Sequence, residues 1–281
     1  MGKKVSEIVK TKVLELFDKI ESQDWETPYL YPKNFISKHE YRGINRLLLS
    51  GSPYWLTNNQ LKELYKKKGW RLKKGSKASI AVFFKPQQIE VIEKDEEGNE
   101  IIITKDVPIL KYYYLFPILD VVDENGNPVY EPVKETNRTK ELLSTLRNYC
   151  QIEGIRIIET AQFEASFYSQ DKDVIGMYPH IKDDIDYVMT FAHEAVHSTK
   201  HEKRLNRKVD KQMEEAIAEI GSLLLTARYI NIPEDKFKNS VIYIKGWLQE
   251  VSGAKLIKAF NQAEKASEYI ISRANLNQKV A

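Results

Sequence analysis

The chain has 281 residues, 42% of them hydrophobic, which is enough for two domains of ordinary size with a packed core in each. Its single cysteine, Cys150, excludes an internal disulfide and any thiolate-rich metal site. No apolar run approaches the roughly 20 residues that span a bilayer, and the first residues lead into an amphipathic pattern instead of an apolar leader. We therefore expect a cytoplasmic protein that does not bind membranes.

The formal net charge of +3 hides an asymmetry along the chain. Residues 1–85 hold 18 Lys/Arg against 8 Asp/Glu, whereas residues 86–281 hold 25 against 32. A basic front and a mildly acidic rear indicate that one domain meets a polyanion while the other has a different task. We predict one domain over residues 1–135 and a second over residues 136–281.

The front is expected to be an α+β domain with a small antiparallel sheet. Its apolar spacing predicts a helix over residues 3–21, and Thr57 can cap a helix over residues 58–68 that ends at Gly69. Strands are predicted over residues 78–84 and 110–116, with alternating strands between them around the charged turn 95–99.

The basic residues of the front are interleaved with aromatic rings. Unpaired nucleic acid is bound by such a mixture, because phosphates attract the cations and bases stack on the rings at roughly 1–3 kcal/mol each. The same composition is equally compatible with rings in the core and lysines on a solvated surface. The residues that carry the DNA-binding prediction are Trp25, Lys33, Tyr41, Arg42, Trp55, Lys73, Lys74 and Lys77.

Two short strands, residues 165–168 and 173–177, are predicted ahead of the most informative segment of the rear. A strand that borders a peptidase cleft can pair with an extended peptide through backbone hydrogen bonds. Residues 174–177 are our candidate for this strand.

Residues 184–203 have the pattern of an amphipathic helix and contain the sequence His-Glu-Ala-Val-His at positions 193–197. Imidazoles four positions apart lie on one helical face, so His193 and His197 can hold a single Zn²⁺ ion, with Glu194 beside its open position. His201 lies one turn further, but three ligands in a row on one helix cannot enclose a tetrahedral ion. We expect His201 at the surface.

A third ligand is required, and we expect it on the next helical run, which follows the polar connector 203–210 and continues through residue 225. Glu215 is the predicted ligand, with Glu214 as the alternative. Glu219, one turn further along the same face, is predicted to accept the outer N–H of a ligating histidine. Without the upstream motif, each of these glutamates would be interpreted as part of a solvated helix face.

This pattern predicts a zinc-dependent hydrolase. Three protein ligands leave a fourth position for a water molecule, whose pKa the ion lowers toward about 7. Glu194 can take the proton of this water and deliver it to a leaving amine, so peptide-bond hydrolysis fits best. Mn²⁺ or Co²⁺ can stand in place of zinc.

Several strings along the chain, in one order, resemble ArdC-type antirestriction proteins. In the front they are Trp25 and residues 32–34, 41–45, 54–57 and 73–77; in the rear they are residues 167–169, the zinc motif and residues 201–207, 214–221, 246–248 and 262–270. The resemblance implies a domain that binds single-stranded DNA, followed by a mainly helical zincin-like metallopeptidase domain with a short sheet. It adds Asn34 and Asn45 to the predicted DNA contacts, whereas residues 88–105 and 120–135 match nothing in the family.

Three functions remain open. The first is an antirestriction protein of a plasmid or phage that binds incoming single-stranded DNA, and duplex DNA more weakly, and cleaves an unidentified protein or peptide near it. The second is a DNA-tethered metalloprotease of broader duty, and the third is a DNA-binding shield without catalysis. Glu194 argues against the third, because a purely structural metal site needs no base.

Overall fold

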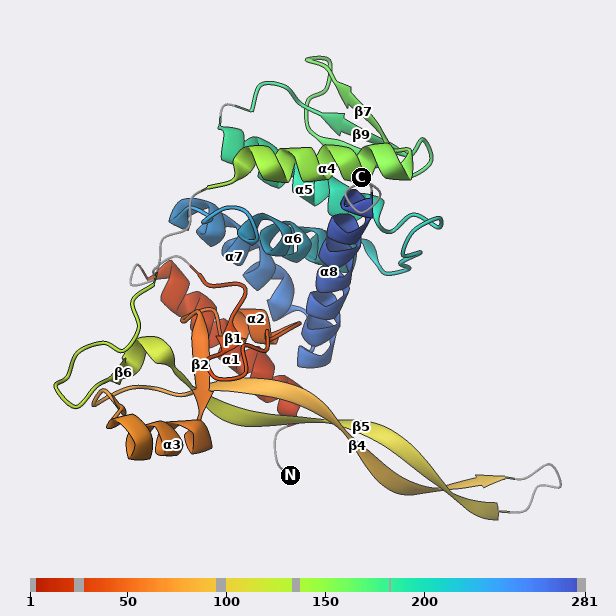
Figure 1. Ribbon diagram of the computed structural model, residues 1–281. Coiled ribbons are helices and arrows are strands. Elements are labelled where there is room, and N and C mark those ends of the chain that lie inside the picture. Colours follow the sequence, from red (N-terminus) through yellow and green to blue (C-terminus); the bar gives the residue numbers. More distant parts are fainter. Residues whose placement is uncertain (1–3, 23–27, 95–99, 133–136, 182, 277–281) are drawn as a thin grey trace.

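A computed structural model describes residues 4–22, 28–94, 100–132, 137–181 and 183–276 (Figure 1). The front of the chain contains α1 (Val5–Glu21), β1 (Lys33–Asn34), α2 (Asn45–Leu48), β2 (Tyr54–Thr57), α3 (Asn58–Lys68), β3 (Arg71–Leu72), β4 (Ser79–Lys94), β5 (Glu100–Pro117), η1 (Ile118–Asp120) and β6 (Val121–Val122). The rear contains α4 (Thr139–Glu153), β7 (Arg156–Glu159), β8 (Phe167–Ser169), β9 (Val174–Met177), α5 (Asp184–Ser198), α6 (Lys211–Ala227), α7 (Glu234–Gln249) and α8 (Gly253–Ala274). This arrangement confirms the predicted α+β fold class with a mainly helical rear.

The main sheet of the front has the strand order β1-β2-β5-β4 and is antiparallel except for the parallel pair β1 and β2. β4 and β5 pair without a break from Ser79↔Leu115 to Lys94↔Glu100. The outer part of this hairpin extends away from the rest of the molecule as a twisted arm (Figure 1). The predicted strands 78–84 and 110–116 are therefore the inner ends of much longer strands, and the predicted turn 95–99 lies outside the described residues.

The predicted helix 58–68 is present as α3, and the expected signals define both of its ends. The hydroxyl of Thr57 accepts the backbone N–H of Gln60 at 3.3 Å, and the side chain of Gln60 accepts the N–H of Thr57 at 2.9 Å. This reciprocal pair satisfies two N–H groups that a helix start leaves without partners. At the other end Gly69 has a φ of 70°, a left-handed conformation that glycine adopts without steric cost.

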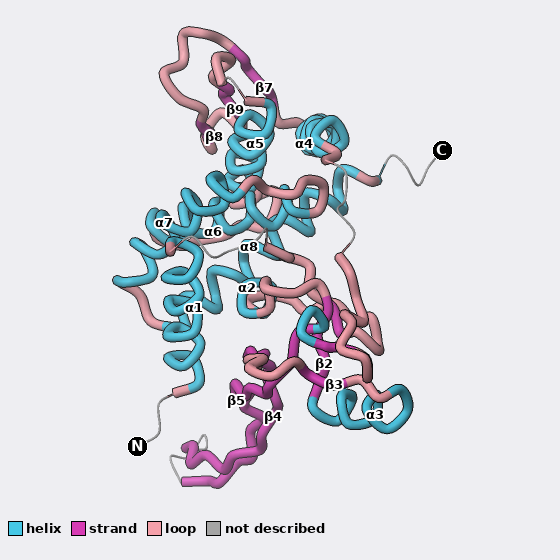
Figure 2. The backbone as a smooth tube through the Cα atoms, turned by 90° about the vertical axis from the view of Figure 1, so that its left-hand side faces the viewer, coloured by secondary structure: helices cyan, strands magenta, loops and turns pink. Residues whose placement is uncertain are grey.

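One hydrophobic core runs from the front into the rear. α1 packs against α7 and α8 (Figure 2), and Val9 and Phe17 share a buried cluster with Ile244 and Phe260. At Gly253 an added Cβ would lie 1.9 Å from the carbonyl oxygen of Ser6, so only glycine allows this approach. The domain boundary at residues 135 and 136 stays a prediction, and residues 133–136 lie outside the described ranges. Among the described residues, no helix has the length and apolar character needed to cross a bilayer.

The small sheet of the rear has the order β7-β9-β8, so β9 lies in its middle. β9 is parallel to β7 and antiparallel to β8, and all four of its residues are buried. The prediction that residues 174–177 pair with a substrate was wrong, because both edges of this strand are already paired. The edge strands are β7 and β8, and β8 is the one that contacts α5.

α5 ends at Ser198, five residues before the end of the predicted helical run. The hydroxyls of Ser198 and Thr199 turn back to the carbonyls of Ala195 and Val196 at 2.7 and 2.6 Å, so the last turn is satisfied by side chains. His201 therefore lies beyond the helix, where it is buried and its Nδ1 accepts the N–H of Lys203 at 3.2 Å. The expectation that His201 lies at the surface was wrong.

Candidate metal centre

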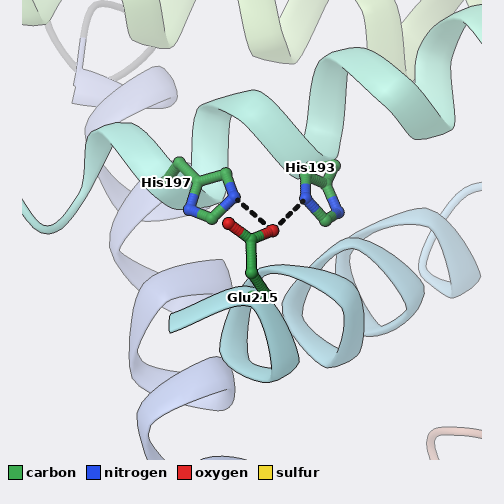
Figure 3. A group of neighbouring side chains, drawn as sticks. All are labelled: His193, His197 and Glu215. Atoms are coloured by element: carbon green, nitrogen blue, oxygen red, sulfur yellow. Dashed lines mark ion pairs between the residues drawn. The ribbon is translucent and has the colours of Figure 1, made fainter. Parts of the chain in front are cut away.

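The three predicted ligands come together between α5 and α6 (Figure 3). His193 and His197 extend from one face of α5, and Glu215 faces them from the first half of α6. A carboxylate oxygen of Glu215 lies 3.6 Å from Nε2 of His193 and 3.3 Å from Nε2 of His197. One ligand atom from each residue lies within 4.8 Å of the other two. The site is half-enclosed, because His193 and Glu215 remain partly exposed while His197 is buried.

Each histidine has a second carboxylate on its other ring nitrogen. Nδ1 of His193 lies 3.2 Å from Glu219, and Nδ1 of His197 lies 3.1 Å from Glu214. A carboxylate on Nδ1 holds the proton there and leaves Nε2 free as an electron-pair donor. Glu219 thus lies at the outer nitrogen of His193, where the prediction expected it, and Glu214 lies at the equivalent nitrogen of His197 instead of facing Nε2 as the alternative ligand would.

The close approach of α5 and α6 brings Glu215 to the histidines. At Gly221 an added Cβ would lie 2.9 Å from a methyl group of Val196 on α5, which is closer than side chains normally pack. α6 begins where Asp210 accepts the backbone N–H of Met213 at 2.8 Å. This cap places Glu214 and Glu215 in the first turns of the helix, opposite the end of α5.

Arg207 holds Glu214 in place, and the sequence pattern did not predict this role. The guanidinium donates two hydrogen bonds to the Glu214 carboxylate, at 2.6 and 2.8 Å, and a third to the hydroxyl of Thr199 at 2.9 Å. Arg207 and Glu214 are both buried, so this bidentate pair is shielded from water. The connector between the helices thereby fixes the ring of His197. The resemblance of residues 201–207 to the family was the only feature of the sequence analysis that pointed to Arg207.

Glu194 lies on the same helix between the two ligands and is 8% exposed. Burial raises the pKa of its carboxyl group. The neighbouring imidazoles partly offset this rise. The backbone N–H of Tyr168 on β8 lies near this carboxylate and acts to lower its pKa. A buried carboxylate with a raised pKa is suited to take up and release a proton near neutral pH.

A cavity of about 310 Å³ opens beside His193 and Glu194. Its opposite wall is formed by α7, which contributes Asn239, Ser240 and Tyr243. At its rim Lys236 pairs with Asp186 at 2.5 Å. The cavity is lined by polar and apolar groups and has room for a side chain of a bound molecule next to His193 and Glu194.

The charges of His193 and the two carboxylates beside it depend on one another. Burial by itself would lower the pKa of His193, but hydrogen bonds to Glu215 and Glu219 raise it to about 10. The same bond to His193 lowers the pKa of Glu215 to about 2. A proton and a cation compete for Nε2 of His193, so loading a cation displaces a proton from the site.

The donor set fits a divalent cation with borderline character. Two imidazole nitrogens and one carboxylate oxygen are the ligands that catalytic zinc sites use, with one position left for water or substrate. The carboxylates on both Nδ1 atoms are the outer partners that such sites also contain. Manganese accepts the same nitrogen and oxygen donors.

Comparisons with known proteins match the front and the rear of the chain separately. Residues 3–116 match the family model for the N-terminal domain of anti-restriction factor ArdC, and residues 145–264 match a zincin-like metallopeptidase. The crystal structures of the antirestriction protein ArdC from plasmid R388, one metal-free and one Mn(II)-bound, are 27% and 26% identical to this chain, each with a TM-score of 0.65. They cover 95% of it and 97% and 98% of their own chains. No curated protein matches in sequence.

The chain belongs to the ArdC-type antirestriction proteins. Both of its matched regions and almost its whole length agree with that family. A divalent metal in the zincin-like region is consistent with the ligands that α5 and α6 bring together.

In the ArdC-type front, two of the rings predicted to contact DNA, Tyr41 and Trp55, lie inside the protein. Tyr41 and Trp55 are 7% and 4% exposed and pack in one cluster with Leu49 and Leu115. The indole N–H of Trp55 is shared between the carbonyls of Leu49 and Ser52. These rings stabilise the domain, and their contact with DNA stays a prediction.

The two predicted amides also have partners inside the domain. The side chain of Asn34 exchanges hydrogen bonds with Gln60, both at 3.0 Å. The side chain of Asn45 donates to the carbonyl of Val82 at 2.9 Å and accepts its N–H at 2.7 Å, which joins α2 to β4. The side chains of both asparagines therefore join backbone segments or side chains within the front.

The predicted cations are mostly at the surface. The side chain of Arg42 is 67% exposed. Lys73, Lys74 and Lys77 are exposed in the loop between β3 and β4, and Lys33 is partly buried. Trp25 lies outside the described residues. The structure therefore divides the predicted DNA contacts into an exposed cationic set and an internal set.

Proposed function

We propose that this antirestriction protein binds the single-stranded DNA of a plasmid or phage and that its rear cleaves peptide bonds with a zinc ion. The observation that carries the proposal is the convergence of both Nε2 atoms on Glu215, beside a buried Glu194 and an open cavity. A structural metal site would need the ligands but no base and no cavity.

The residues of the site divide the chemical work. His193, His197 and Glu215 would hold the ion. When bound, it supplies Lewis acidity, which lowers the pKa of a water molecule and polarises a carbonyl group. Glu194 takes a proton from the attacking water and delivers it to the nitrogen of the leaving amine. Its raised pKa favours the second transfer, because the carboxyl group stays protonated long enough to act as an acid.

The edge strand β8 is the substrate-binding strand that this geometry supports. Its Tyr168 N–H reaches Glu194, so a peptide that lies along β8 passes next to the base. Backbone pairing of this kind accepts many sequences, and a side chain can enter the adjacent cavity. The substrate class is therefore an extended protein segment.

Single-stranded DNA binding rests on the exposed cations of the front and on membership of the family. Arg42, Lys73 and Lys74 are exposed at the surface, where phosphates can reach them. Duplex DNA offers the same phosphates but hides the faces of its bases, so we expect weaker binding of duplex. Zinc is the proposed native metal, and Mn²⁺ or Co²⁺ can replace it because the donors are nitrogen and oxygen.

A DNA-tethered protease of broader duty would use the same site, and it differs only in the proteins that are cleaved. A DNA-binding shield without catalysis is disfavoured, because it leaves the buried Glu194 and the cavity without a role.

The substitution Glu194→Gln tests the peptidase. We expect metal content to stay at the wild-type level while cleavage falls by about 10²- to 10⁴-fold, because the base is lost and the ligands are kept. Metal is measured by elemental analysis of the purified protein. Cleavage is measured on casein and on a basic protein bound to single-stranded DNA, with and without the DNA.

The exposed Glu202 provides a matched control, because Glu202→Gln makes the same chemical change outside the site. Wild-type cleavage by Glu194→Gln would contradict the assignment of the base. Full antirestriction by Glu194→Gln in cells, with cleavage lost in vitro, would favour the shield.

A further inference from the structure

The arm formed by β4 and β5 has two chemically different halves. Residues 77–89 and 107–119 contain three lysines and no acidic residue, and they include six aromatic residues. Residues 90–106 contain seven acidic residues against two lysines. The half of the arm next to the body is therefore basic and aromatic, and the outer half is acidic.

The register of the hairpin places a ring and two cations on one face of the inner half. Cross-strand partners point to the same face, and so do residues two apart along a strand. Phe83 is opposite Lys111, and Lys85 is opposite Ile109. Phe83 is 41% exposed, and both lysines are exposed. The open ring of Phe83 is thus flanked by two free ammonium groups. Lys111 lies directly across the hairpin from the ring, and Lys85 is the next side chain on that face of the same strand, about 7 Å away.

The ring of Phe83 is supported from the body of the protein. It packs edge to face against Tyr113, with 5.7 Å between ring centroids. Tyr113 in turn packs against the buried cluster that contains Tyr41 and Trp55. A stacking surface needs such support, because a ring that is held in one orientation loses little freedom when a base settles on it. The internal rings of the front therefore restrict the orientation of the exposed ring of Phe83.

The opposite face of the same segment has rings but lacks cations. Phe84, Tyr112 and Tyr114 lie on it, and they are 55%, 37% and 57% exposed. Between residues 79 and 89 and between 107 and 115, the positions on this face carry no basic residue in the sequence. Only the face of Phe83 combines a ring with positive charge.

We propose that the face of the arm formed by Phe83, Tyr113, Lys85 and Lys111 is a binding site for single-stranded DNA, with a base stacked on Phe83 and the adjoining phosphates on the two lysines. The proposal rests on the proposed DNA-binding function and gives it a location. Unpaired strands fit this face because their bases expose a flat surface, whereas the bases of a duplex are covered by their neighbours. The acidic outer half repels phosphates and limits the bound strand to the inner half.

Fluorescence anisotropy with a labelled oligothymidine strand tests the site. Phe83→Leu keeps an apolar side chain against Tyr113 but removes the aromatic face. We expect its affinity for the single strand to fall by about 5- to 100-fold, and its affinity for a duplex of the same length to stay unchanged. Phe84→Leu is the matched control, because it makes the same change at the next residue on the other face, and it should bind as the wild type does.

The two lysines are tested through the salt dependence of binding. In Lys85→Ala/Lys111→Ala, we expect the slope of log affinity against log salt to shrink by about 1.4, or about 0.7 for each lost phosphate contact. A wild-type complex made with 5-iodouracil in place of thymine should crosslink to the peptides that contain Phe83 or Tyr113, as read by mass spectrometry.

If the wild type binds the single strand while Phe83→Leu and the double lysine variant bind equally well, the arm is not the site. If the wild type does not bind the single strand at all, the proposed DNA-binding function fails and the location fails with it. Equal losses in Phe83→Leu and Phe84→Leu would also overturn the choice of face.

Discussion

The metal centre and the basic front use their charged residues in different ways. At the candidate metal centre, residues that the sequence placed on two helices approach one another to between 3.2 and 3.6 Å. In the front, the predicted contacts are divided between surface and interior. A cation demands ligands at fixed distances, and helical spacing provides them, whereas a polyanion accepts positive charge from many arrangements. The spacing of residues in a sequence therefore predicts the ligands of a metal ion better than it predicts the contacts of a polyanion.

Arg46 shows how far a basic residue of the front can be from a binding surface. Its side chain is 1% exposed and donates to Glu40 at 2.6 Å and to Glu264 of α8 at 2.7 Å. It also lies 4.1 Å from the ring of Tyr31. This arginine joins the front to the rear instead of meeting DNA.

The largest expected effect is that of Arg46→Met. It leaves two carboxylates without their buried partner, so we expect the free energy of unfolding to fall by about 3 kcal/mol. Urea denaturation measures the change. The exposed Arg42 is the control, and Arg42→Met should change the stability by less than about 0.5 kcal/mol. Equal stability of the two variants would break the distinction between internal and surface cations.

A smaller effect is expected from Glu214→Gln, which tests the candidate metal centre. The amide cannot hold the proton on Nδ1 of His197 as the carboxylate does, so metal affinity should fall by about 10- to 100-fold. Competition with a chelating dye measures the affinity of folded protein, and circular dichroism checks that the variant is folded. Glu219→Gln should act similarly through His193, and the exposed Glu202→Gln should not. Unchanged affinity in Glu214→Gln would show that the ligands alone determine binding.

The smallest effect is expected from Lys73→Ala/Lys74→Ala. Each lysine would neutralise one phosphate, so the salt slope of single-strand binding should shrink by about 1.4, with weak dependence on base sequence. Lys255→Ala/Lys258→Ala, at exposed positions on α8, is the control. A slope that changes equally in both variants would mean that the front has no special role in attracting DNA.

The features that the sequence predicted well depend on neighbours within one or two helical turns. The ends of α3 follow from Thr57, Gln60 and Gly69, which act within the helix itself. The face that carries His193 and His197 follows from their spacing of four residues. Residues 174–177 were recognised as a strand, but their position in the middle of the sheet depended on β7, which is distant in the sequence.

By itself, the sequence determined the α+β class, the face of α5 that carries both histidines and the residue types that would hold an ion, because local hydrogen bonding and helical periodicity control these features. Only the tertiary structure decided that Glu214 and Arg207 orient His197, that Tyr41 and Trp55 are internal and that Phe83 is open to solvent. These outcomes depend on which elements pack together. Residues far apart in the chain then compete for the same interior, and composition does not say which of them is buried.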